Sequence, residues 1–391
     1  TVFGFWNARA ANQQKDAAQY TALLSEIKTL KTSNPSLADQ LLLAAHKHRP
    51  DDASVTAQII AAQTQPESTA LMGHTSTVYD IRFNQSGSLM ASAANDHTGR
   101  IWVRTSNGRY RPAGVLRGYS TYLTSVSFDP AAPYLATGAG DGTLRIWDIA
   151  NPDAPVLVST QHPGHGTVYI VAFSPEGSQV AAPSEDGSIT LYDSTRPTAP
   201  TESAVIHRHT GDVRTLAYTP NGRFLASGGD DKTVTLDDVS NPHAPTPVGA
   251  PLTGFPSTTH GLSFDSSGTR LAITGDGSNS QLWDTSNPYA PRPVTTSMPG
   301  MTARSWSIVF NPAGTMVAAA QYDGSTKVWN TVDNPSNPEV VWTLRDISDQ
   351  SGALNLNTAA FSPDGRTLSV GRSDGEISLW HLPDSVTLAH S

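Results

Sequence analysis

The feature that most constrains this chain is a unit of about 45 residues that recurs seven times. Each unit closes on a short strand, and the last residue of that strand marks the period. Successive markers lie 45, 45, 45, 46, 46 and 51 residues apart. They are Trp102, Trp147, Tyr192, Asp237, Trp283, Trp329 and Trp380. Because periods of roughly 20–50 residues are typical of repeat architectures, we expect one repeat array rather than several unrelated domains.

The same local pattern returns inside each unit. An apolar strand ends in an aromatic residue and a tight turn, as in 173–177, where Pro presets φ and Gly permits a positive φ. A second strand, a glycine turn such as 140–142 and an alternating third strand such as 143–147 follow. A proline-containing linker such as 151–155 then leads to a fourth strand. Four short strands in each of seven units predict an all-β, seven-bladed β-propeller of four-stranded blades.

Two short motifs recur within the units. They are two Trp-Asp dipeptides and two Gly-His dipeptides: Trp147-Asp148, Trp283-Asp284, Gly73-His74 and Gly164-His165. These motifs resemble those of the WD-repeat β-propeller family, and the resemblance covers about residues 68 to 382. The resemblance implies that an N-terminal strand near 68–72 serves as the outer strand of the last blade and closes the ring. Closure of this kind hides the sheet edges.

The resemblance also implies a buried polar network in the blades. In that family a His, a Ser or Thr, an Asp and the Trp form a hydrogen-bonded tetrad. The first blade keeps all four members, as His74, Ser92, Asp96 and Trp102. The other blades that we compared depart from the pattern. The second has Tyr119 for the His, the fourth has Asp237 for the Trp, and the seventh lacks the Gly-His pair.

Residues 1–66 differ from the rest and are predicted to be a helical N-terminal segment, with the propeller over 67–391. Apolar residues recur at helical spacing on one face at Tyr20, Leu23, Leu24, Ile27 and Leu30. Asn34-Pro35 starts a second helix through Leu37, Leu41 and Ala45, which Pro50 ends. Asp51 or Asp52 starts a short third helix with Val55, Ile59 and Ala62, and Pro66 stops it.

This N-terminal segment has two interpretations. It resembles the linker of actinobacterial multidomain signalling proteins, between a membrane helix and a C-terminal WD-repeat propeller. That resemblance implies a possible membrane tether preceding residue 1, with residues 2–6 as its tail. The alternative is a helical cap packed on the propeller. Cytoplasmic and membrane-tethered locations both stay open.

Composition narrows the chemistry. A net charge of −9 argues against nucleic-acid binding, whose footprint is a basic patch. The absence of cysteine excludes disulfides, zinc–thiolate sites, iron–sulfur clusters and a cysteine nucleophile. No nucleophile elbow, zinc helix or phosphate loop occurs. The recurring aspartates are interpreted as turn residues, and the histidines His74, His165 and His209 fall in separate blades. We therefore predict no catalytic residue, no metal and no cofactor.

A binding face follows from the family resemblance. In WD-repeat proteins the partner face carries residues at the start of the innermost strand and just before the turn aspartate. Each of the seven units contributes three such positions, two near the start of the innermost strand and one just before the turn aspartate. Five of these 21 positions are aromatic, where the chain average of 7% would give one or two. Aromatic residues and Arg are enriched at interface hot spots, although aromatics also favour strands in general. The predicted face comprises Tyr79, Tyr122, Tyr169, Arg214, His260, Arg304, Trp306 and Tyr322.

The sequence thus predicts a monomeric, non-catalytic propeller that binds a protein or peptide partner, as a scaffold or sensor module of a bacterial regulatory protein. Two other hypotheses stay open. One is a propeller enzyme that acts on a small ligand in the central channel. The other is a structural scaffold that holds neighbouring domains.

Overall fold

The computed structural model describes residues 2–33, 35–52, 54–55, 66–277, 280–345 and 355–383. The chain divides into two compact units. One contains Thr1–Glu67 together with Leu382–Ser391, and the other contains Ser68–His381.

The first unit is helical, as predicted. It contains α1 (Val2–Ser33) and α2 (Pro35–His48). α2 begins at the proline expected to start it, because the fixed φ of proline suits the first turn of a helix. Tyr20 and Ile27 of α1 pack against Leu42, Ala45 and Val55. Most of the predicted third helix, including Ile59 and Ala62, lies outside the described residues. Among the helices that the structure describes, none is both long and apolar enough to cross a bilayer.

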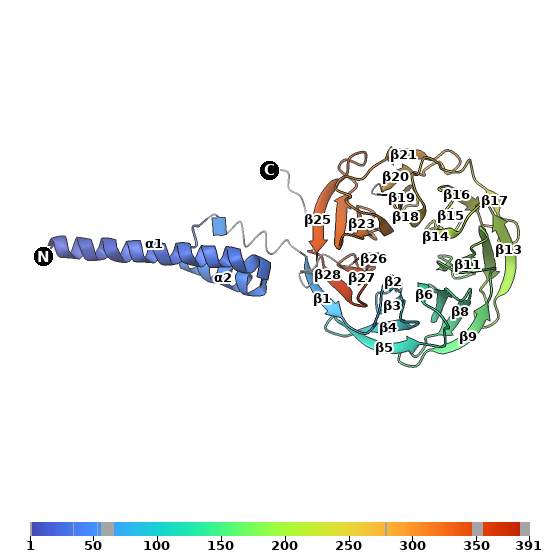
Figure 1. The fold of residues 1–391 in the computed structure, drawn as a ribbon, viewed down its shortest axis with the longest axis horizontal. Helices are drawn as coiled ribbons and strands as arrows, with labels where there is room; N and C mark the ends of the chain where they lie inside the picture. The colour runs from blue at the N-terminus through green and yellow to red at the C-terminus, as the bar shows by residue number, and fades with distance from the viewer. Residues whose placement is uncertain are drawn as a thin grey trace. The chain divides into compact units, whose positions relative to one another are not determined.

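The second unit is a seven-bladed β-propeller, which confirms the predicted fold (Figure 1). Each blade is a four-stranded antiparallel sheet, and in blades 1 to 6 the strands follow chain order from the axis outward. Blades 1 to 3 consist of β2 (Val78–Phe83), β3 (Leu89–Ala94), β4 (Gly99–Arg104), β5 (Tyr110–Leu116); β6 (Leu123–Phe128), β7 (Tyr134–Ala139), β8 (Leu144–Asp148), β9 (Val156–Gln161); and β10 (Ala172–Phe173), β11 (Gln179–Pro183), β12 (Ser188–Asp193), β13 (Thr201–His207).

The remaining blades repeat this order, and the last one is completed from the other end of the propeller sequence. Blades 4 to 6 consist of β14 (Val213–Tyr218), β15 (Phe224–Gly229), β16 (Val234–Asp238), β17 (Thr246–Pro247); β18 (Thr259–Phe264), β19 (Arg270–Gly275), β20 (Gln281–Asp284), β21 (Arg292–Thr295); and β22 (Ser305–Phe310), β23 (Met316–Gln321), β24 (Ser325–Asn330), β25 (Glu339–Arg345). Blade 7 contains β26 (Leu356–Phe361), β27 (Thr367–Arg372) and β28 (Ile377–His381).

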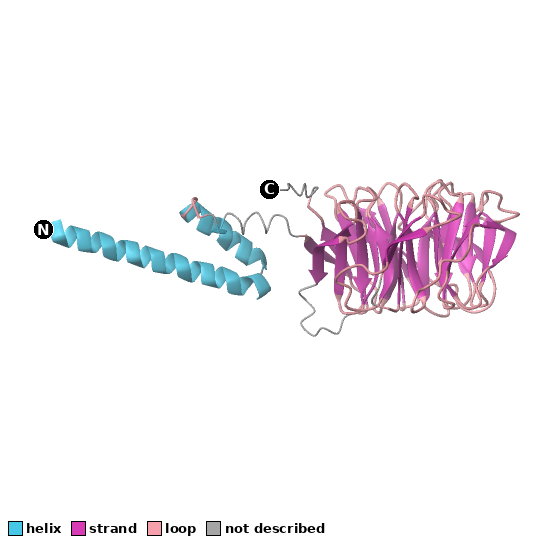
Figure 2. Cartoon of the chain, turned by 90° about the horizontal axis from the view of Figure 1, so that it is seen from above, coloured by secondary structure: helices cyan, strands magenta, loops and turns pink. Residues whose placement is uncertain are grey.

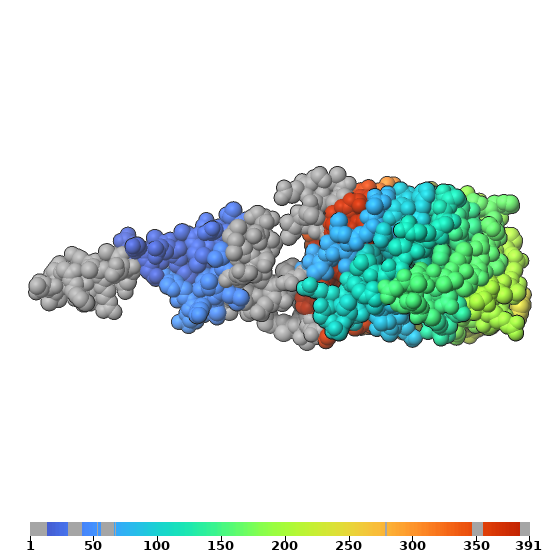
Figure 3. All heavy atoms as spheres, turned by 90° about the horizontal axis from the view of Figure 1, so that it is seen from below, coloured from blue at the N-terminus to red at the C-terminus, as the bar shows by residue number. Residues whose placement is uncertain are grey.

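Ring closure occurs as the sequence predicted. The N-terminal strand β1 (Glu67–Leu71) pairs with β28, so that blade 7 has the order β1-β28-β27-β26. Blade 7 therefore joins strands from opposite ends of the propeller sequence, and its outer edge is covered. Figure 3 shows the outer wall, where segments from cyan to yellow-green follow one another in chain order.

The arrangement sets two kinds of surface. The innermost strands, such as β2, β6, β14, β18 and β26, surround the axis, whereas β5, β9 and β13 lie on the circumference (Figure 1). The strands run between the two faces of the disc, and the loops gather at those faces (Figure 2). Side chains at the ends of the innermost strands are therefore brought together near the axis of the ring.

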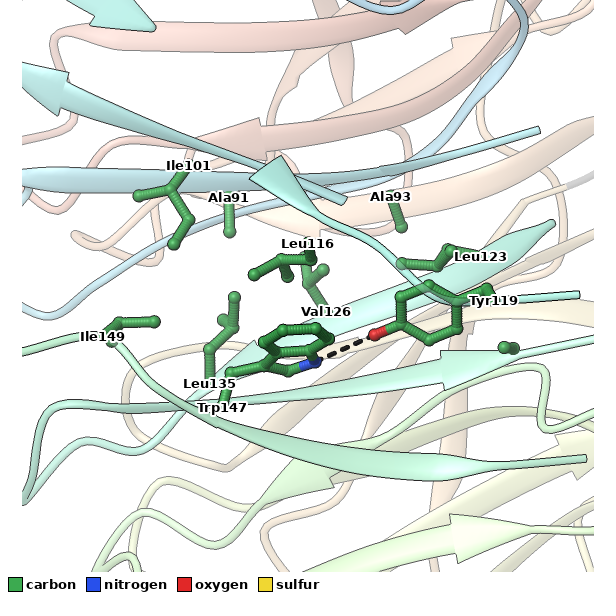
Figure 4. Packing of buried hydrophobic residues seen from close by; sticks show 11 residues of the cluster. Ala91, Ala93, Ile101, Leu116, Tyr119, Leu123, Val126, Leu135, Trp147 and Ile149 are labelled. Carbon is green, nitrogen blue, oxygen red and sulfur yellow. Dashed lines mark hydrogen bonds between the residues drawn. The ribbon is translucent and has the colours of Figure 1, made fainter. Parts of the chain in front are cut away.

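Apolar residues from neighbouring blades form shared cores. In the cluster of Figure 4, Ala91 and Ile101 of blade 1 pack with Val126, Leu135 and Trp147 of blade 2. Each blade alone would expose apolar residues on both of its faces, and stacking the blades removes them from water. Burial between blades thus accounts for the stability of the ring.

A buried polar network lies inside blade 1. His74 Nδ1 is 2.9 Å from Asp96 Oδ2, and His74 Nε2 is 2.8 Å from Ser92 Oγ. Trp102 Nε1 donates to the same Ser92 hydroxyl at 3.0 Å. These are the four residues that the family resemblance singled out. The network satisfies polar groups that would be costly to bury without partners.

Candidate partner-binding site at the central channel

A β-bulge in the innermost strand positions the residues at the channel mouth. In blade 1, Val78 pairs with Ala94 and Asp80 pairs with Ala93, so Tyr79 has no opposite residue. A bulge of this kind bends the strand and redirects a side chain. The same register shift recurs in five other blades, at Thr124, Arg214, His260, Trp306 and Asn357. In blade 3 the corresponding residue, Tyr169, precedes the short strand β10.

The six residues at the bulges and Tyr169 line one cavity of about 280 Å³ in the central channel. Tyr122 also lines this cavity. Six of the eight residues of the predicted face therefore meet around a single space, namely Tyr79, Tyr122, Tyr169, Arg214, His260 and Trp306. Arg304 and Tyr322 are not among the lining residues, but both contact Trp306.

An aromatic cluster forms one side of the mouth. The ring centroids of Trp306 and Tyr322 are 4.9 Å apart, and those of His260 and Trp306 are 5.4 Å apart. The guanidinium of Arg304 lies over the Tyr322 ring, 3.9 Å from its centroid. The site thus combines three flat rings with an exposed cation that lies over two of them, Trp306 and Tyr322.

A second aromatic pair lies on the blade 1 and blade 2 side. Tyr79 and Tyr122 pack edge to face, with centroids 5.8 Å apart. Gly140 makes room for this arrangement, because a Cβ there would lie 2.8 Å from Tyr122 Cζ. Burial raises the pKa of Tyr79, so its hydroxyl stays protonated at neutral pH.

Arg214 is held between an aromatic ring and two carboxylates. Its guanidinium stacks 4.0 Å from the Tyr169 centroid and lies 2.7 Å from Asp230 and 2.9 Å from Asp212. Burial alone would lower the pKa of Arg214, but the hydrogen bond from its guanidinium to Asp230 and the nearby negative charges raise it instead. Tyr169 Oη donates to Glu185 at 3.1 Å. These contacts fix both side chains in the channel wall.

His260 and Trp306 share a carboxylate across two blades. His260 Nε2 lies 3.1 Å from Asp276 Oδ2, and Trp306 Nε1 donates to Asp276 Oδ1 at 3.2 Å. Burial lowers the pKa of His260 below 6.5, although Asp276 opposes the shift. The imidazole is therefore neutral at pH 7 and acts as a flat hydrogen-bonding surface rather than as a cation.

Within a blade, the residue at the start of the innermost strand contacts the residue just before the turn aspartate. The second residue lies 16 positions after the first in the sequence. This spacing joins Tyr79 to Asn95, Tyr169 to Glu185, Arg214 to Asp230, His260 to Asp276 and Trp306 to Tyr322. Because these side chains already hold one another in place, they lose less conformational entropy when a partner binds.

Two residues outside the predicted face, Asn357 and Asp80, also line the cavity. Asn357 is only 2% exposed and lines the cavity. Asp80, one position past the bulge, accepts from the backbone N–H of Val126 in the next blade at 3.1 Å and lies 3.2 Å from Arg82 Nε. Ser125 and Ser307 accept from the following blade in the same way. The Asp80 carboxylate therefore links two blades. A small polar residue recurs at this position in the sequence, and this recurrence could have predicted the contact between blades.

The arrangement offers little metal chemistry in the part of the chain that the structure describes. There, no group of three or more His, Asp or Glu side chains is placed to hold a metal ion. His74 and His209 form hydrogen bonds within their own blades, with Asp96 and Asp231. The recurring aspartates accept hydrogen bonds inside their own turns, as Asp186 does from Ser188.

Comparison with protein families agrees with this geometry. The WD domain, G-beta repeat, matches at residues 65–103, 110–148, 156–193, 201–236, 293–330 and 343–381, which is more than half of the chain. The chain therefore belongs to the WD-repeat family. Each match joins the outer strand of one blade to the three inner strands of the next. The repeat that ends in blade 5 is not matched, although the blade is present. No curated protein matches the chain.

Membership in this family carries a general function. WD-repeat propellers are generally scaffolds that bind proteins or peptides, and they are typically not enzymes. Because function depends on the site rather than on the fold, the particular role of this chain has to be argued from the channel mouth.

Proposed function

We propose that this propeller is a non-catalytic binding module whose protein or peptide partner docks on the channel mouth. The observation that carries the proposal is the convergence of Tyr79, Tyr122, Tyr169, His260 and Trp306 on one cavity. Such side chains combine a large apolar area with a polar end, which suits them to interfaces. Arg304, stacked on Tyr322, extends the surface outward from the cavity.

The finer assignment concerns the setting of this module. We include in the proposal that the propeller serves a bacterial multidomain regulatory protein, because residues 1–66 resemble the linkers of such proteins. The helical pair α1–α2 ahead of the ring is consistent with a spacer. Fractionation of the source cells, followed by detection of the native protein with an antibody to the propeller, would test whether it associates with membranes.

The main test is a double variant of the aromatic cluster. Trp306→Ala with Tyr322→Ala removes two stacked rings and the platform under Arg304. Hot-spot aromatics typically contribute about 2 kcal/mol or more each, so partner retention in a pull-down from lysate should fall by at least about tenfold. The matched control is Tyr289→Ala, which removes a ring that is 57% exposed outside the cavity lining.

The outcome separates the proposal from its competitors. Loss of the partner with the double variant, together with an unchanged melting temperature and retention by Tyr289→Ala, supports docking at the mouth. Equal retention by the double variant and the intact chain would show that the partner uses another surface.

A further inference from the structure

The charge at the channel mouth favours a cationic occupant. Four carboxylates lie on the residues paired around the cavity, those of Glu185, Asp212, Asp230 and Asp276. Against them stand Arg214 and Arg304, which leaves two negative charges. Both arginines that line the cavity itself lie beside carboxylates, Arg82 at Asp80 and Arg214 at Asp212 and Asp230. The four carboxylates are not among the lining residues, so the excess negative charge surrounds the cavity, where it disfavours an approaching anionic occupant.

The walls of the cavity add a second attraction for cations. The electron-rich faces of Trp and Tyr attract ammonium and guanidinium groups, most strongly where water is excluded. Trp306, Tyr79, Tyr122 and Tyr169 all line the cavity. His260 shares the wall and stays neutral near pH 7, because burial lowers its pKa. It does not repel a cation there.

An unsatisfied amide in the wall points independently to a ligand. Asn357 is 98% buried, and neither its Nδ2 nor its Oδ1 has a hydrogen-bond partner among the described residues. Leaving a buried polar group unpaired costs about 1–3 kcal/mol. Both atoms are also closed to solvent, so this side chain has to turn toward the occupant before Oδ1 can accept from one of its N–H groups and Nδ2 can donate to a carbonyl of the same peptide. The bulge at Asn357 redirects this residue in the same way as the other cavity residues.

The size of the cavity limits what can enter. Its volume of about 280 Å³ lies just below the range of roughly 300–1,000 Å³ for pockets that enclose drug-sized ligands. A single long side chain fits this space better than a folded element does. We propose that the cavity receives one arginine or lysine side chain of the docked partner, with its cationic end between the aromatic wall and the Asn357 amide. The proposal rests on the proposed function and names the residue class that the mouth selects.

Oriented peptide libraries test this selectivity on the full chain. Each library fixes one central residue as arginine, lysine, citrulline or glutamate and randomises its neighbours. Citrulline is the matched probe, because it keeps the shape of arginine and lacks the charge. The immobilised chain should retain the arginine or lysine library at least about tenfold better than the citrulline library, as a desolvated cation–π contact implies.

Three variants locate the effect. Asp276→Asn removes a charge and keeps the shape, Asn357→Leu removes the amide, and Trp306→Ala removes the ring. Each should reduce the preference for the cationic library several-fold, whereas Tyr289→Ala should leave it unchanged. Equal retention of the citrulline and arginine libraries, still lost with Trp306→Ala and Tyr322→Ala, would overturn the cation proposal and leave the docking face standing. Retention that ignores the double variant would overturn the docking face itself. Failure to retain any library would also overturn the cation proposal.

Discussion

Blades 1 and 4 have the same buried network with one member exchanged, and the exchange shows what each part does. In blade 1, Ser92 Oγ contacts His74 and receives the indole N–H of Trp102. In blade 4, Ser227 Oγ contacts His209 and Thr235. The His–Ser contact and the His–Asp contact are both preserved without the tryptophan. The indole is therefore not required to complete the hydrogen bonding.

The exchanged position remains equally buried in both blades. Trp102 and Asp237 are each 1% exposed. Asp237 has Arg208 Nε at 3.1 Å, and this arginine supplies the opposite charge. Burial still raises the pKa of Asp237, although Arg208 opposes the shift. A packing residue in one blade has thus been replaced by an ion pair in another, and the two solutions should respond differently to substitution and to pH.

The largest effect is expected where packing dominates. Trp102→Ala removes a fully buried indole and should lower the free energy of unfolding by about 3–5 kcal/mol. Urea denaturation followed by circular dichroism measures this loss. Trp306→Ala is the control, since its ring is only half-buried and should cost much less. A loss below about 1 kcal/mol for Trp102→Ala would show that blade 1 does not depend on its tryptophan.

Blade 4 should instead depend on charge. Arg208→Ala leaves a buried carboxylate without its partner and should cost about 3 kcal/mol at pH 7.5. Because the pKa of Asp237 is already raised in the folded protein, its ionisation opposes folding at high pH. Arg208 lowers the pKa of Asp237, so that pKa lies higher still in the variant. The loss relative to the unaltered chain should therefore be fully present above the variant's pKa, and should vanish as the pH falls below the pKa of Asp237 in the unaltered chain.

Denaturation of Arg208→Ala at several pH values measures this dependence. The control is Arg223→Ala, which breaks the ion pair with Asp238, where the arginine is 52% exposed, and should cost less than about 1 kcal/mol. A loss for Arg208→Ala that is independent of pH would contradict the role assigned to the Asp237 charge.

The same contrast explains what the sequence predicts well. The regular spacing of markers such as Trp102 and Trp147 fixes the number of blades, because each blade needs one closing strand. The spacing can be recognised even though Asp237 replaces the aromatic residue at one marker, because the length of the whole unit sets the period. The closing strand β1 follows from the family pattern, and the structure confirms it.

The details of the site were less accessible. Counting along each innermost strand finds six residues of the predicted face that line the cavity, from Tyr79 to Trp306. It does not reveal the bulge that turns them inward, because register depends on pairing with the second strand. Nor does it reveal that Asn357 is buried without a partner or that Arg208 pairs with Asp237. These features arise from side chains that meet only in the folded ring.

Blade 2 offers a third version of the network and the smallest predicted effect. Tyr119 Oη contacts Thr137 Oγ1 at 2.6 Å. It also accepts a hydrogen bond from Trp147 Nε1 at 2.9 Å (Figure 4). Tyr119→Phe keeps the ring and removes this bridge, so it should cost about 1–2 kcal/mol, measured by urea denaturation. Tyr289→Phe, on an exposed ring, should cost almost nothing. If Tyr119→Phe also leaves the free energy of unfolding unchanged, the hydrogen bonds of the Tyr119 hydroxyl do not stabilise blade 2. The polar network would then contribute to stability in blade 1 and not in blade 2.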